Sequence, residues 1–256
     1  MSRTLALAYG TIAYAIFLGT FLYAIGFVGN FVVPTALDGP AAAPFWRSLA
    51  VDLGLLALFA VQHSLMARQG FKRLWTRIVP EPVERSTYVL FASLALIAMF
   101  AFWQPIGGVV WTVEDPMARA AIYAVFALGW GVVLVSTFLI NHFDLFGLRQ
   151  VWLHWRGVPY EPLGFRTPAL YRRVRHPIYL GFILAFWATP TMTAAHLVFA
   201  VMTTAYILIA IQLEERDLLA FHGKAYADYR RQVRMLIPLR RAGRAGAAPS
   251  STQPAQ

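Results

Sequence analysis

The chain has 256 residues, of which 59% are hydrophobic and only 13% are charged, and its mean hydropathy is +0.56. This composition is too apolar for an ordinary soluble domain, which must surround its core with polar residues. The net charge is +10, and the charges are confined to a few loops and the tail, a placement that indicates membrane orientation rather than nucleic-acid binding. The chain has no cysteine, which excludes disulfides, thiolate metal sites and a cysteine nucleophile.

Five apolar tracts follow one another along the chain, at about Leu5 to Val33, Leu49 to Met66, Tyr88 to Trp103, Ala118 to Ile140 and Ile178 to Leu213. Most approach or exceed the roughly 20 residues that a helix needs to cross a bilayer. The first tract is too long for a signal peptide and has no small-residue cleavage site. We therefore predict an all-α polytopic transmembrane helical bundle with five or six membrane segments.

The last apolar tract is long enough for two passes through the membrane. Pro190 and the threonine-rich stretch from Thr189 to Thr193 interrupt it, which predicts a helical hairpin with a short first arm and a longer second arm.

Basic residues occur in alternate connections between the tracts. Pro34 to Phe45 and Gln104 to Met117 contain no Lys or Arg, whereas Ala67 to Arg85 and Asn141 to His176 are rich in them. The positive-inside rule then predicts that both termini are cytoplasmic, and we expect a bacterial inner-membrane protein. We predict one transmembrane domain over residues 1–240 and a disordered cytoplasmic tail over 241–256, which is rich in Ala, Gly, Ser, Pro and Gln.

A basic run leads directly into the hairpin with the sequence YRRVRHPIYLG, residues 171–181. Pro177 suits the first turn of a helix, and Glu214 and Glu215 return to the same face at the end of the second arm. Acids beside His, Arg and Tyr suit an amino-acid nucleoside, which carries an amine, a carboxylate and hydroxyls. The alternative is that the arginines contact lipid phosphates and the glutamates pair with them.

RHPIYLG, followed by EERDLLAFHGKAYADYRRQVRMLIP, resembles the isoprenylcysteine carboxyl methyltransferase and phospholipid methyltransferase superfamily over Tyr171 to Pro238. The resemblance implies an S-adenosylmethionine site, mainly within residues 163–238. It places cofactor-binding roles on Tyr171, Arg175, His176, Pro177, Tyr179, Gly181, Glu214, Glu215 and Tyr226. Taken alone, the segment after the two acids would be an amphipathic surface helix, whereas in the superfamily it folds over the cofactor.

Two further blocks, NHFDLFGLRQ at 141–150 and QHSLMAR at 62–68, resemble the methanethiol S-methyltransferase branch of this superfamily. The prenylcysteine enzymes carry an Arg shortly before the acidic pair, where this chain has Ile211 and Gln212. The resemblance therefore implies methylation of a small thiol, methanethiol, to dimethyl sulfide. The alternatives are a methyltransferase acting on a lipid or prenylcysteine carboxylate or amine, and a non-catalytic membrane sensor or transport protein.

A thiol acceptor is mostly protonated near neutral pH, given a reference pKa of about 8.5 for Cys, so it needs a base or a positive field. His142 with Asp144 is one candidate base, provided that the helix ends near Asn141, and Arg149 is a candidate to stabilise the thiolate. The alternative is that Asn141 and Asp144 only cap helix ends. His63 is a second candidate base, with a bundle-stabilising hydrogen bond as its alternative role.

The spacing of the histidines forms no metal-binding motif, so we expect no catalytic metal. The histidines considered as ligands are His63, His142, His154, His176 and His196, five of the six in the chain. We expect a small-molecule thiol and membrane lipids as partners and no nucleic acid, and the sequence leaves the oligomeric state open.

Overall fold

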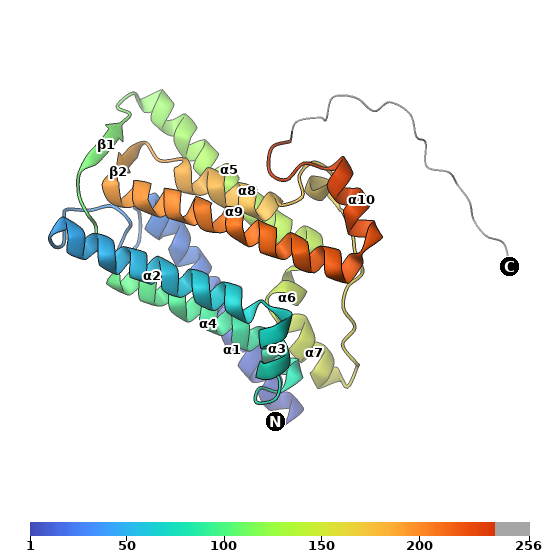
Figure 1. The fold of residues 1–256 in the computed structure, drawn as a ribbon. Helices are drawn as coiled ribbons and strands as arrows, with labels where there is room; N and C mark the ends of the chain where they lie inside the picture. Colours follow the sequence, from blue (N-terminus) through green and yellow to red (C-terminus); the bar gives the residue numbers. More distant parts are fainter. Residues whose placement is uncertain (239–256) are drawn as a thin grey trace, which may run out of the picture.

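The computed structural model describes residues 1–238 and confirms an all-α helical bundle (Figure 1). Its helices are α1 (Arg3–Gly29), α2 (Phe45–Met66), α3 (Gln69–Trp75), α4 (Glu81–Phe102), α5 (Pro116–Ile140), α6 (His142–Leu145), α7 (Leu148–Arg156), α8 (Pro177–Trp187), α9 (Ala194–His222) and α10 (Lys224–Gln232). One 3₁₀ turn, Ala169–Arg172, precedes α8, and two strands, β1 (Val109–Thr112) and β2 (Thr191–Thr193), form a small sheet. The predicted tail at 241–256 lies outside the described residues, and the predicted domain bounds stay a prediction.

Among residues 1–238, the five helices α1, α2, α4, α5 and α9 are long and apolar enough to cross a membrane. The chain is therefore an integral membrane protein. The predicted hairpin is confirmed, because the chain leaves helical geometry after Trp187 and resumes it at Ala194, around Pro190. Its first arm, α8, has only 11 residues, while α9 has 29.

Several span boundaries differ from the predicted ones, and α2 begins at Phe45 rather than Leu49 while α9 ends at His222 rather than Leu213. Helix α1 ends at Gly29, where Asn30 adopts a left-handed conformation, rather than at Val33. Helix α4 begins at Glu81, seven residues before the apolar tract, because Pro80 and Pro82 suit a helix start and Glu81 and Glu84 favour its positive end. Hydropathy does not detect the polar first turn of α4.

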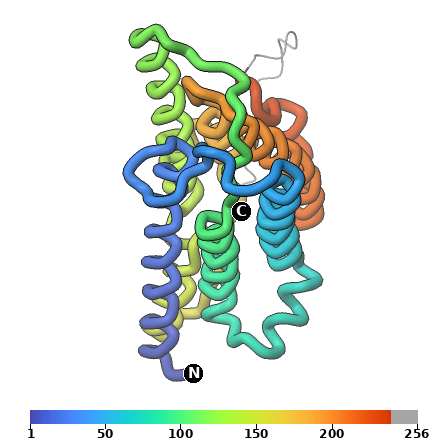
Figure 2. Tube along the Cα trace, turned by 90° about the vertical axis from the view of Figure 1, so that its left-hand side faces the viewer, coloured from blue at the N-terminus to red at the C-terminus, as the bar shows by residue number. Residues whose placement is uncertain are grey.

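The bundle has two chemically different ends. Helices α3, α6, α7 and α10 lie at the end that carries the basic connections, which we call the basic end (Figure 1). Helix α1 runs from this end, where the N-terminus lies, to the loop at residues 30–44 at the opposite end (Figure 2). Helix α5 begins there, and its Arg119 donates to the Val113 carbonyl at 3.0 Å.

The opposite end contains a feature that hydropathy does not predict, the antiparallel pair of β1 and β2. Val109 pairs with Thr193 and Thr112 with Thr191, so the α4–α5 connection is joined to the hairpin turn. The adjoining loop is tied to the same place, because Asp38 accepts a hydrogen bond from Thr193 and lies 3.2 Å from His196 Nδ1. These contacts hold the far end of the short helix α8 within the bundle.

Helix α8 packs closely against α5 through two glycines. A Cβ on Gly181 would lie 2.7 Å from the Gly129 carbonyl oxygen, and a Cβ on Gly129 would lie 2.6 Å from the Ala185 nitrogen. Both distances are to backbone atoms, which cannot move aside as a flexible side chain can. Gly181, predicted from the motif as a cofactor-binding residue, therefore also determines how closely α8 approaches α5.

Gly147 has a similar role between the NHFDLFGLRQ segment and α4. Its φ is +87°, and a Cβ would lie 2.7 Å from the Ser86 nitrogen. A glycine is thus required on both conformational and steric grounds. The helix that follows, α7, then packs Val151 against Gly10 of α1.

Replacing Gly181 by Ala should destabilise the protein by about 1–3 kcal/mol, because the added methyl group overlaps backbone atoms of α5. The matched control is Gly131→Ala, where no atom lies within 4 Å of the new Cβ. That variant should keep its stability or gain slightly, since Ala favours a helix over Gly. Denaturant-induced unfolding in detergent, followed by circular dichroism, measures both, and equal losses would show that the α5–α8 contact is not constrained.

Candidate active site

His176 and Glu215 lie together at the basic end, at the start of α8 and near the end of α9. His176 Nε2 is 3.0 Å from Glu215 Oε1, and both side chains are buried. His176 directly precedes Pro177, the first residue of α8, and its main-chain N–H donates to the Met235 carbonyl at 3.1 Å. The hairpin thus brings together two residues that are 39 positions apart in the sequence.

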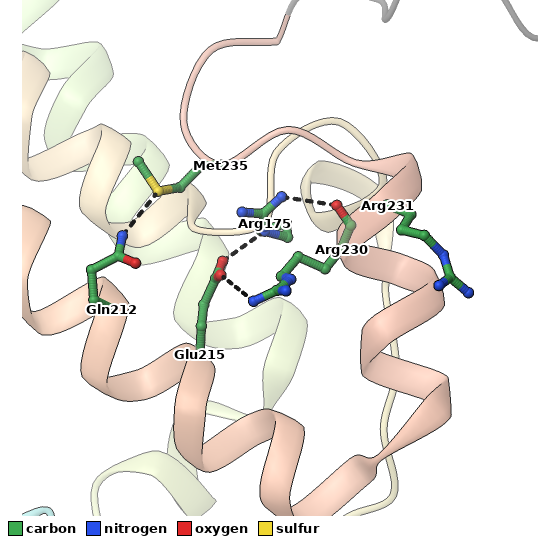
Figure 3. A pocket seen from close by; sticks show the side chains of 6 residues that line it. All are labelled: Arg175, Gln212, Glu215, Arg230, Arg231 and Met235. Atoms are coloured by element: carbon green, nitrogen blue, oxygen red, sulfur yellow. Dashed lines mark hydrogen bonds and ion pairs between the residues drawn. The ribbon is translucent and has the colours of Figure 1, made fainter.

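Arg175 connects this pair to the C-terminal segment. Its Nε donates to Glu215 Oε1 at 2.7 Å, and its Nη1 donates to the carbonyls of Val233 at 2.6 Å and Arg230 at 3.2 Å (Figure 3). Its main-chain N–H also donates to the Arg234 carbonyl at 2.8 Å. The segment after α10 therefore lies alongside the RHPIYLG motif.

The two neighbouring glutamates have different surroundings. Glu215 has a side chain that is 7% exposed and binds Arg175 and His176, so its charge is balanced within the protein. Glu214 is 42% exposed, and it accepts a hydrogen bond from the Tyr179 hydroxyl at 2.8 Å. Its nearest other polar contact is His176 Nδ1 at 3.8 Å. Glu214 is therefore the acid with capacity to bind an added cationic group.

Three tyrosines lie beside this cluster. The Tyr229 hydroxyl donates to the Tyr171 carbonyl at 2.6 Å, and Tyr226 is buried, with Phe165 packed against both Tyr226 and Tyr229. Burial raises the pKa of Tyr171 and Tyr226, and it raises the pKa of Tyr229 to about 12. All three hydroxyls therefore stay protonated at neutral pH. That of Tyr229 is already used as a donor, and that of Tyr171 donates only at 3.4 Å, to the Ser136 carbonyl.

A second polar cluster lies between α2, α4 and α9, slightly deeper in the bundle. His63 Nε2 is 2.9 Å from the Tyr88 hydroxyl, and the Arg85 guanidinium lies 4.9 Å from the centre of the Tyr88 ring. The Ser64 hydroxyl donates to that of Tyr206 at 3.2 Å. Tyr88 interacts electrostatically with Glu214, which places the His63 cluster near that acid.

Sequence reasoning did not identify Tyr88, Tyr206 or Arg85 as site residues. The sequence places Arg85 in a basic loop, because the predicted span begins only at Tyr88. Tyr88 and Tyr206 are single tyrosines within apolar tracts, so only the packing of α2, α4 and α9 shows that they share one cluster.

His142 does not form the suggested pair with Asp144. Its Nδ1 lies 2.8 Å from the Thr137 hydroxyl, and its Nε2 lies 2.8 Å from that of Tyr14. Its ring stacks on Phe138 at a centroid distance of 4.2 Å, and the side chain is 4% exposed. The helix does end at Ile140, as the pairing required, but the turn that follows directs His142 into the bundle.

Asp144 instead binds Arg149, whose Nη1 lies 2.8 Å from Asp144 Oδ1. The side chain of Asn141 accepts from the Asp144 main-chain N–H at 3.0 Å, which is the helix-capping role given as the alternative. Arg149 also donates to the Glu161 carbonyl, so both partners are engaged in holding this turn and the following loop together.

Metal-binding geometry is not found in the described part of the chain, where no three His, Asp or Glu residues gather closely enough to hold an ion.

Comparison with known proteins shows extensive similarity to methyltransferases. The chain is 59% identical over 238 residues to a methanethiol S-methyltransferase of Mycobacterium tuberculosis, covering 93% of this chain and 98% of that protein. It is 57% identical to one from Crocosphaera subtropica, with 93% of each chain covered. The chain belongs to the methanethiol S-methyltransferase family.

A more distant relative is human Nurim, which is 34% identical over 198 residues, covering 72% of this chain and 75% of Nurim. No protein-family model matches the chain. No solved structure matches it either. Membership of the methanethiol S-methyltransferase family confirms the predicted branch and makes the protein an enzyme that requires a methyl donor.

His142 predicts how the stability of this family member depends on pH. Burial lowers its pKa below the ordinary 6.5, so the unfolded chain binds a proton more readily than the folded protein. Neutral His142 therefore contributes fully to the free energy of unfolding above pH 6.5. This contribution is lost as the pH falls from 6.5 toward the pKa of His142 in the folded protein. The midpoint of thermal unfolding should decrease over this range.

His142→Gln should reduce this decrease, because an amide can still bond Tyr14 and Thr137 but does not titrate. His154→Gln, on α7 and partly exposed, is the matched control and should keep the wild-type slope. A slope unchanged in His142→Gln would assign the acid sensitivity to other groups.

Proposed function

We propose that this membrane methyltransferase converts methanethiol to dimethyl sulfide with S-adenosylmethionine as the methyl donor. In the balanced reaction the sulfonium methyl group moves to the thiol sulfur, which leaves S-adenosylhomocysteine and one proton. The thiol acceptor is supported by family membership, since relatives that are 57–59% identical are methanethiol S-methyltransferases. The donor is supported by the chemistry of the acidic pair and its neighbours.

The observation that carries the donor assignment is the exposed carboxylate of Glu214. Tyr179 holds one of its oxygens, yet 42% of the side chain remains exposed. A carboxylate in this state suits the amino group of an amino-acid nucleoside. The protonated hydroxyls of Tyr171 and Tyr226 are further groups that we assign to this site, and Glu215 positions Arg175 and His176 beside it.

The basic end suits a charged, water-soluble donor, because it is the end that the positive-inside rule assigns to the cytoplasm. We therefore propose that both termini and the donor site face the cytoplasm of a bacterial inner membrane. The catalytic domain, in this proposal, comprises residues 1–240.

For the acceptor we assign the base to His63 rather than His142. His63 lies in the cluster next to Glu214, and its two ring nitrogens share one hydroxyl, that of Tyr88. The two ring nitrogens of His142 instead have separate hydroxyl partners, Thr137 and Tyr14, in an aromatic enclosure. The thiol proton passes to His63, and the positive charges of Arg85 and Arg68 favour the thiolate that remains. Tyr88 orients the imidazole through its hydroxyl.

Glu214→Gln and Glu215→Gln separate donor binding from folding. Glu214→Gln should weaken S-adenosylmethionine binding by about 10- to 100-fold, because one charged hydrogen bond is lost, while the thermal midpoint stays near the wild-type value. Glu215→Gln should lower the stability by several kcal/mol, about 3–5 when one partner of a buried pair is removed. Equilibrium binding of labelled S-adenosylmethionine in nanodiscs tests this, and unchanged binding by folded Glu214→Gln would contradict the donor site.

His63→Gln should lower the rate of methylation by about 10²- to 10⁴-fold with donor binding retained, the range expected on removing a general base. Headspace gas chromatography of dimethyl sulfide over membranes given methanethiol and S-adenosylmethionine measures the rate, with His154→Gln as control. Loss in His142→Gln but not in His63→Gln would transfer the role to His142. Donor binding by the wild type without any dimethyl sulfide would exclude the thiol.

A further inference from the structure

A pocket with a volume of about 350 Å³ lies on the outer side of the Arg175–Glu215 pair (Figure 3). It is formed where α9, α10 and the segment after α10 meet at the basic end. Its lining residues are Arg175, Gln212, Glu215, Arg230, Arg231 and Met235. None of these except Arg175 and Glu215 belongs to the donor site proposed above.

The pocket lies on the outward face of α9, not in the interior of the bundle. Val201, Leu208, Gln212 and Glu215 are spaced by seven, four and three residues, so they form one stripe along the helix. Val201 and Leu208 are 45% and 41% exposed, as expected for side chains that face lipid. Glu214 is rotated away from this stripe and contacts Tyr179 instead. The pocket therefore continues a lipid-facing surface.

The charges around the pocket are not balanced. Of the three arginines that line it, Arg175 and Arg230 share one carboxylate, that of Glu215, while Arg231 binds Asp228. Arg175 binds Glu215 at 2.7 Å, whereas Arg230 approaches the same carboxylate only to 3.8 Å and is 47% exposed. Because two arginines share one carboxylate, the Arg175–Arg230–Glu215 group carries one positive charge in excess among the described residues, on planar guanidinium groups that suit a phosphate.

We propose that this pocket binds the headgroup phosphate of an anionic phospholipid, with an acyl chain lying along Val201 and Leu208. A phosphodiester carries the single negative charge that the pocket lacks, and the apolar stripe leads directly into it. Basic residues at the membrane surface attract anionic lipids in this way. Because Arg175 and Arg230 also contact Glu215, the bound lipid stabilises α10 against the RHPIYLG motif.

The test uses the full chain purified in detergent and titrated with phosphatidylglycerol, phosphatidylcholine or inorganic phosphate. Native mass spectrometry measures retained lipid, and thermal unfolding measures stabilisation. Phosphatidylglycerol should be retained and should raise the unfolding midpoint, whereas phosphatidylcholine and inorganic phosphate should not. Arg230→Gln and Arg231→Gln should each weaken retention by about fivefold, the factor expected for one basic residue at a membrane surface.

Arg216→Gln is the matched control, because Arg216 is an exposed arginine of α9 next to Glu215 that does not line the pocket. Its lipid retention should equal that of the wild type. If Arg216→Gln lost as much bound lipid as the pocket variants, the retention would be due to general surface charge. If phosphatidylglycerol and phosphatidylcholine were retained equally, the pocket would not recognise an anionic lipid. Competition by inorganic phosphate would indicate a site for free anions, and displacement of lipid by S-adenosylmethionine would assign the pocket to the methyl donor. Each of these four results overturns the proposal.

Discussion

The arrangement of the basic end depends on the buried carboxylate of Glu215. A buried charge is unfavourable unless it is paired and hydrogen-bonded, and Arg175 and His176 both meet the same oxygen of Glu215. Arg175 in turn donates to the Val233 carbonyl. Three chain segments that are distant in sequence, the entrance to α8, the end of α9 and the segment after α10, are thus held together by one carboxylate.

Glu214 and Glu215 are adjacent in the sequence but have different partners and different roles. Consecutive residues of a helix point about 100° apart. Glu215 therefore meets the arginines at the outer side of the bundle, while Glu214 meets Tyr179 and the cluster that contains His63 and Tyr88. The first acid keeps capacity for a ligand because the second balances the cations of the RHPIYLG motif.

The spans, the hairpin and the meeting of RHPIYLG with the two acids follow from the sequence, because hydrophobic length and the break at Pro190 determine them. The hydrogen-bond partners of individual side chains cannot be predicted from the sequence in the same way. His142 and Asp144 lie two positions apart, yet the turn after Ile140 directs His142 to Tyr14, 128 residues away, and leaves Asp144 to Arg149. Likewise, the close approach of Gly181 to Gly129 depends on how α8 crosses α5, which no local pattern specifies.

The shortness of α8 sets the depth of the site. Its 11 residues extend about 16 Å, roughly half of the hydrocarbon thickness, whereas the 29 residues of α9 exceed it. Trp187, at the end of α8, donates a hydrogen bond to Thr204, which lies well inside α9. Beyond α8, the sheet of β1 and β2 satisfies backbone hydrogen-bonding groups in the part of the bundle that α8 does not reach. The pairing of His176 with Glu215 therefore lies about two turns before the end of α9, close to the level where a bilayer meets water. A site at that depth suits the function proposed above, which needs access for a charged donor from solution and for a small apolar thiol dissolved in the membrane.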